Sequence, residues 1–60
     1  MELNTKETIK KKLLDAQESV RDYQMYSGKV SDPEISSTFK EFAEQSAIQA
    51  QKLQKLLDRF

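Results

Sequence analysis

Two polar side chains with the chemistry to bind something interrupt an otherwise apolar ladder in the second half of this 60-residue chain. Ser46 and Gln49 occupy its two central positions. The apolar residues of the ladder recur at steps of four and three and are Ile35, Phe39, Phe42, Leu53, Leu56 and Phe60. Such steps place side chains on one stripe of an α-helix, the stripe that a helical bundle buries. A buried polar group is costly unless it is hydrogen-bonded or functional, so this gap is the first candidate site.

Other groups that could carry chemistry are few. The chain has no cysteine and no histidine, which removes thiolate and imidazole ligands as well as disulfides. Without these residues or a glycine-rich loop, one hairpin can assemble neither a nucleophile–base pair nor a phosphate cradle. We therefore expect no enzyme activity, no catalytic, cofactor or metal residues, and no cofactor. The carboxylates are scattered over the expected outer helix faces and are Asp15, Glu18, Asp22, Glu41 and Glu44.

Charge and hydropathy argue against two classes of partner. Ten basic and ten acidic residues cancel, so bulk charge favours neither nucleic acid nor an anionic membrane. The basic run Lys10–Lys12 could touch phosphate or an acidic partner, but a solvated helix face is favoured. No apolar run is long enough for a membrane span or a signal-peptide core. We expect a cytoplasmic protein.

The elements that would position these residues are two helices. A first ladder of the same spacing consists of Ile9, Leu13, Ala16, Val20 and Tyr23. Asn4 and Glu7 have capping-box spacing, and Gly28 is placed as a left-handed C-terminal cap, which predicts a helix over about 5–27.

The second helix has two candidate starts. Ser31 with Glu34 fits a capping box, while Asp32 followed by Pro33 offers an N-cap with proline at the first helical position. Either predicts a helix over about 33–59 after a turn over about 28–32. A single helix running through Gly28 and Pro33 is disfavoured, because four start and stop signals coincide there.

A short turn makes the two helices antiparallel. Centring the turn near residues 30–33 brings Tyr23 near Phe42, Val20 near Ser46 and Ala16 near Gln49. We thus predict an all-α fold, one helical hairpin over residues 1–60. A chain of this size with 37% apolar residues needs support, and oligomerisation is the device left. Two hairpins pairing as a homodimeric four-helix bundle would close the core.

Aromatic and sulfur side chains gather toward the turn end: Tyr23, Met25, Tyr26, Phe39 and Phe42. Most fit the core, whereas Met25 and Tyr26 lie off the strict ladder. These two are the best candidates for contact with a protein partner.

The ladders also carry a family resemblance. The stretch from Phe39 to Leu57 resembles the second helix of a rubrerythrin or ferritin-like hairpin, whose pattern is close to F-x-E-x-A-E-Q-E-x-x-H-A. Residues 16–23 resemble the family's E-x-x-x-x-x-x-Y, ending at Tyr23. The resemblance covers roughly residues 9–57 and implies the four-helix-bundle fold.

The family's metal-binding residues are missing. A helix 1 glutamate and a Glu-x-x-His pair on helix 2 hold the family's di-iron centre, and those positions here are Ala16, Ser46 and Gln49. Aligning Glu18 as the ligand instead would rotate it about 200° away from the seam. The resemblance therefore implies the fold and argues against the activity.

Three functions remain open. The leading one is a non-enzymatic ferritin-like hairpin that self-associates, in a structural or adaptor role. The alternatives are a small di-metal or redox relative of rubrerythrin, and a partner-binding hairpin like short proteins of spore-forming bacteria. For the Ser46–Gln49 layer, a hydrogen-bonded layer that fixes register is favoured over a vestigial metal site or a small-molecule pocket.

Overall fold

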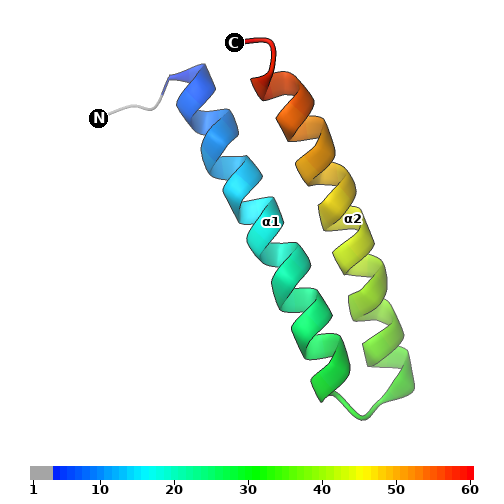
Figure 1. Cartoon of the computed structure of the whole chain (residues 1–60). Coiled ribbons are helices and arrows are strands. Elements are labelled where there is room, and N and C mark those ends of the chain that lie inside the picture. The colour runs from blue at the N-terminus through cyan, green and yellow to red at the C-terminus, as the bar shows by residue number, and fades with distance from the viewer. Residues whose placement is uncertain (1–3) are drawn as a thin grey trace.

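A computed structural model describes residues 4–60 as two antiparallel helices joined by a three-residue connection (Figure 1). Helix α1 spans Thr5–Lys29 and helix α2 spans Pro33–Leu57. Within the described residues there is no β-strand. The predicted all-α hairpin is confirmed, and residues 1–3 of the predicted domain lie outside the described part.

Helix α1 begins where the sequence predicted and ends later. The Asn4 side chain accepts a hydrogen bond from the backbone N–H of Glu7 at 2.8 Å, which satisfies one free donor of the first turn. At the other end, the prediction that Gly28 is a left-handed cap was wrong. Gly28 lies inside the helix without a positive φ, and the helix is closed by the extended residue Val30, whose N–H donates to the Tyr26 carbonyl.

Helix α2 begins at the Asp32–Pro33 alternative. Asp32 accepts hydrogen bonds from the backbone N–H groups of Glu34 and Ile35 at 2.9 and 3.2 Å. Pro33 takes the first turn, where its missing donor costs nothing. The helix ends at Leu57, two residues before the predicted end. Beyond it the chain tightens, since the N–H groups of Arg59 and Phe60 bond carbonyls only three residues back.

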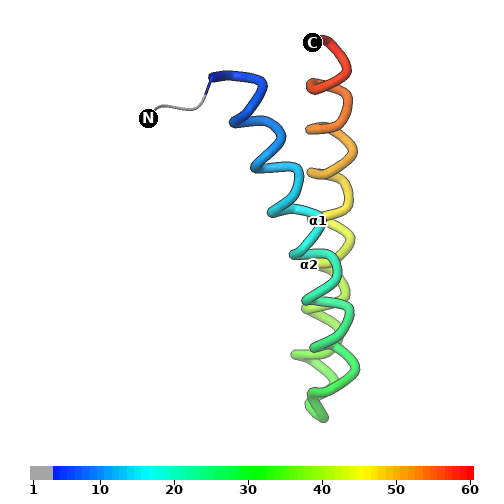
Figure 2. The backbone as a smooth tube through the Cα atoms, turned by 60° about the vertical axis from the view of Figure 1, so that its left-hand side comes forward, coloured from blue at the N-terminus to red at the C-terminus, as the bar shows by residue number. Residues whose placement is uncertain are grey.

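The helices run side by side in Figure 1 and cross in the turned view of Figure 2, so they are inclined to one another. Their register is set by aromatic contacts near the turn, because the Tyr23 ring lies 5.6 Å from that of Phe39 and 5.4 Å from that of Phe42. Closer to the turn, the Ser36 hydroxyl donates to the Ser27 carbonyl at 2.7 Å. The predicted pairing of Tyr23 with Phe42 is confirmed.

The hairpin is a single layer of helices. Its principal extents are 42 × 24 × 12 Å, and the smallest equals one helix diameter. The buried apolar core consists of Leu13, Ala16 and Ala43, with one large side chain among them. The chain exposes 4930 Å², against about 4,000 Å² for a compact monomer of 7.0 kDa. One hairpin therefore leaves much of its apolar surface in contact with water.

Candidate functional site

One side of the hairpin carries a groove between the helices, with a volume of about 360 Å³. The residues that line it come from both helices and are Ser19, Tyr23, Phe42, Gln45, Ser46 and Gln49. We call this side the groove face. It contains both members of the polar gap in the α2 ladder, so the structure brings the predicted candidate residues together.

Ser46 and Gln49 have different surroundings in the groove. Ser46 is buried where the helices touch, whereas Gln49 is exposed. Three residues advance a helix by about 300°, which turns Gln49 roughly 60° away from Ser46 and out of the contact line. The prediction that both lie inside a bundle holds for Ser46 in one hairpin, and for Gln49 it stays a prediction about a larger assembly.

The predicted α2 ladder splits into two columns. Phe39, Ser46 and Leu53 are buried or half-buried against α1. The other column lies to one side of that contact, and its apolar members Ile35, Phe42 and Leu56 are 44%, 36% and 40% exposed. Residues seven apart differ by only about 20° around a helix, so this column stays on the groove face along the whole of α2.

The α1 ladder behaves differently. Each of its five members is buried or half-buried, from Ile9 to Tyr23. Leu13, at 9% exposure, is the best-covered large apolar side chain of the described residues. One hairpin thus buries or half-buries every residue of the α1 ladder but only one of the two columns of the α2 ladder.

The two proposed partner-contact residues do not act together. Tyr26 follows the groove-lining Ser19 by seven residues and therefore lies toward the groove face. Tyr26 is 48% exposed, and the Lys29 ammonium lies 6.0 Å from the centroid of its ring. Met25 is also exposed, but one residue earlier on the helix it points about 100° away. Only Tyr26 extends the apolar part of the groove face.

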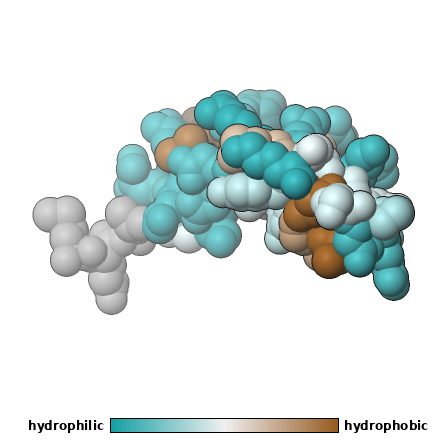
Figure 3. Space-filling view, turned by 90° about the horizontal axis from the view of Figure 1, so that it is seen from below, coloured by the Kyte–Doolittle hydropathy of each residue, from teal (hydrophilic) through white to brown (hydrophobic). Residues whose placement is uncertain are grey.

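The opposite side of the hairpin has a second, smaller hollow of about 300 Å³. It is lined by Val20, Gln24, Lys40, Ala43, Glu44 and Ala47. We call this side the opposite face. Its apolar lining is made of alanines and a half-buried valine, and no aromatic residue is among its lining residues. Figure 3, seen from the turn end, shows a compact hydrophobic patch beside largely hydrophilic surface.

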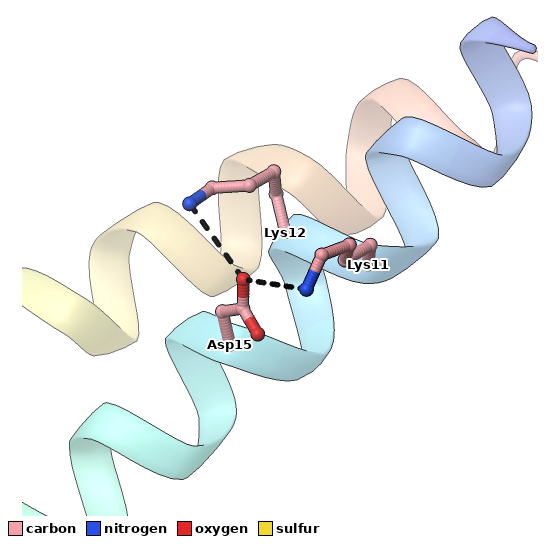
Figure 4. A network of polar contacts seen from close by, with 3 residues as sticks. All are labelled: Lys11, Lys12 and Asp15. Carbon is pink, nitrogen blue, oxygen red and sulfur yellow. Dashed lines mark ion pairs between the residues drawn. The ribbon is translucent and has the colours of Figure 1, made fainter. Parts of the chain in front are cut away.

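The basic run is solvated, and two of its three lysines share one carboxylate. The ammonium groups of Lys11 and Lys12 each lie 3.7 Å from Asp15 Oδ2 (Figure 4). All three side chains are at least 41% exposed, so these pairs contribute little to stability. Lys11 pairs with Asp15 one helical turn along the chain.

The residues at the family's ligand positions do not fit a di-iron centre. Ala16 and Ser46 are buried in the helix contact, where they offer a methyl group and one hydroxyl. Glu18 is exposed. Among residues 4–60, no three His, Cys, Asp or Glu side chains lie close enough together to hold a metal ion. The donor set of the groove is neutral and is suited to hydrogen bonding.

Sequence reasoning missed the serines that join the helices near the turn. Ser27 is buried, its hydroxyl donates to the Gln24 carbonyl, and its own carbonyl receives the Ser36 hydroxyl. Small polar residues beside a turn were the available signal, because they let helices approach closely and still satisfy each other's polar groups.

Neither described helix is long and apolar enough to cross a membrane. Comparisons of the chain with models of protein families, with characterised proteins and with solved structures found no match.

Proposed function

We propose that this chain is a non-enzymatic, ferritin-like helical hairpin that self-associates through its groove face into a homodimeric four-helix bundle, in a structural or adaptor role. The split α2 ladder carries the proposal. One column packs on α1, and the other leaves Ile35, Phe42 and Leu56 more than a third exposed on a single side. Apolar residues aligned at heptad spacing are the usual contact surface of a further helix.

The small core of one hairpin supports the same proposal. Among residues 4–60, Leu13 is the only large apolar side chain that is buried. Burying one large apolar side chain contributes about 1.5–3 kcal/mol, so a core of this size offsets little of the conformational entropy lost on folding. A second layer of helices would bury the exposed column and supply the missing stability.

The family resemblance fits this assembly and gives the polar layer a role. In the resembled hairpins, the positions of Ser46 and Gln49 carry ligands that face the bundle interior. Here a hydroxyl and a carboxamide lie on the groove face. In a dimer these neutral groups would meet their own copies and form hydrogen bonds, which fix register as buried polar residues do in coiled coils.

Sedimentation equilibrium of the full chain between about 1 µM and 1 mM tests the proposal. We expect a concentration-dependent dimer that Phe42→Glu converts to monomer, because the substitution places a charge in the buried interface. Leu14→Glu is the matched control, since Leu14 is 56% exposed and lines neither hollow. A monomer throughout the range would contradict self-association and favour a hairpin that serves a different protein.

A further inference from the structure

We infer that the second copy docks on the groove face with its turn at the opposite end of the bundle, around a two-fold axis that crosses α2 between Ser46 and Ala47. This inference rests on the proposed self-association and specifies its geometry. Two symmetric arrangements would bury the groove face. In the opposed arrangement, α2 lies along α2 of the partner and the turns are far apart. In the aligned arrangement, α1 lies along α2 of the partner and the turns are adjacent.

Charges along one edge of α2 distinguish the two arrangements. Glu34, Glu41 and Lys52 fall within about 20° of one another around the helix, next to the groove-lining Gln45. Arg59 follows Lys52 by seven residues in the closing turn, and all four residues are exposed. The first half of this edge is therefore acidic and the second half is basic.

The opposed arrangement matches these halves. Glu41 and Lys52 are equidistant from the point between Ser46 and Ala47, and so are Glu34 and Arg59. A two-fold axis at that level pairs each carboxylate with a cation of the other copy, and every pair occurs twice. Along α1, the same axis brings Lys12 near Asp22 of the other copy.

The aligned arrangement places like charges together. The hydrogen bond between Ser36 and Ser27 puts Asp22 about level with Glu41, because each lies five residues further from the turn along its own helix. Following the antiparallel helices at 1.5 Å per residue puts Lys12 level with Lys52. Across an aligned interface, these levels set Asp22 against Glu41 and Lys12 against Lys52, while Lys29 would pair favourably with Glu34. Like charges that face each other across an interface disfavour that partner geometry.

The uncharged residues of the exposed column also fit the opposed arrangement. A two-fold axis at nearly the same level brings Ile35, Phe42 and Gln49 of the exposed column against three residues of the other copy that lie outside that column, Phe60, Leu53 and Ser46 respectively. Apolar residues thus meet apolar residues at both ends of the interface. In the middle of the interface, the polar gaps of the two copies face each other, so the Gln49 carboxamide of each copy can reach the Ser46 hydroxyl of the other.

Distance measurement between two spin labels tests the orientation. Ser31 lies exposed in the connection, and the chain has no cysteine, so Ser31→Cys gives one label per copy. The opposed arrangement separates the labels by about 48 Å, from some 16 residues on each side of the axis at 1.5 Å each. Electron–electron resonance should therefore show one long distance. A distance below about 25 Å in a confirmed dimer would overturn the orientation and leave self-association standing.

Exchanging charges gives a second test, because the two arrangements predict opposite changes in the affinity of the dimer. Glu41→Lys should weaken the dimer about 2- to 30-fold, because two attractive pairs become repulsive. The double variant Glu41→Lys with Lys52→Glu should regain the original affinity. In the aligned arrangement, Glu41→Lys would face Asp22 and tighten the dimer, which would overturn the inference. A wild-type chain that stays monomeric up to about 1 mM would instead remove the proposed function itself.

Discussion

The groove face and the opposite face are built from the same two helices but are covered differently. The opposite face is lined by alanines, Val20 and the long polar side chains of Gln24, Lys40 and Glu44. The groove face presents aromatic and branched apolar residues on either side of a polar centre. Small residues let two helices approach closely and leave little apolar surface exposed, so the opposite face needs no further cover.

This difference is the physical basis of the proposed self-association. Among the described residues, those buried between α1 and α2 are mostly small, Ala16, Ala43 and Ser46, and Leu13 is the one large apolar side chain buried with them. Ile35, Phe42 and Leu56 lie beside that contact, on the groove face. Because a single layer of helices cannot bury them, the energetically important surface is the one that one hairpin leaves open.

The largest expected effect comes from Leu53, which borders the groove face and is half-buried in one hairpin. If the dimer completes its burial, Leu53→Ala should lower the free energy of unfolding by about 2–5 kcal/mol. Leu14→Ala is the control, since Leu14 is 56% exposed and should change stability by at most about 0.5 kcal/mol. Urea unfolding at fixed protein concentration compares the two, and equal losses would break the distinction between the faces.

The polar centre of the groove face gives the next effect. Replacing Ser46 and Gln49 together by leucine should keep the helical circular dichroism signal and raise the free energy of unfolding by about 1–4 kcal/mol. The gain arises because apolar packing replaces buried polar groups. Without the polar layer, the two copies should pair in more than one orientation, so spin labels at Ser31→Cys should then show more than one distance. Loss of stability in the double variant would mean that the polar layer stabilises the fold directly.

A smaller effect is expected at the turn end of the contact. Ser36→Ala removes the hydroxyl that donates to the Ser27 carbonyl and should lower the free energy of unfolding by about 0.5–1.5 kcal/mol. Ser37→Ala is the neighbouring control on an exposed position. Because the bond joins α1 to α2 within one copy, the dimer dissociation constant from sedimentation should stay unchanged.

The smallest effect concerns Gly28, which touches neither face. A Cβ atom there would meet nothing within 4 Å, and the backbone has no positive φ. Gly28→Ala should therefore raise the free energy of unfolding by about 0.4–1 kcal/mol, by restricting the unfolded chain. Thermal or urea unfolding measures it. A lower free energy of unfolding would instead support the interpretation of Gly28 as a left-handed helix cap, which the sequence suggested.

Much of the fold could be predicted from the sequence, because its signals are local. The helix starts at Asn4 and Asp32 depend on side chains that reach backbone donors within three residues. The register followed from the length of the turn and is confirmed by the contact of Tyr23 with Phe42. The ends were less predictable. Gly28 is compatible with both a helix and a cap, and the chain beyond Leu57 has no residue that forces a stop.

The sequence alone determined two amphipathic helices, their antiparallel order and the place of the polar gap, since these depend on periodicity and on capping chemistry between near neighbours. Only the tertiary structure decided which column of the α2 ladder faces α1. Both columns, one through Phe39 and Leu53 and the other through Phe42 and Leu56, satisfy the same seven-residue spacing. The relative rotation of two packed helices depends on how side chains fit across the contact, and that fit buried Ser46 and left Gln49 exposed on the groove face.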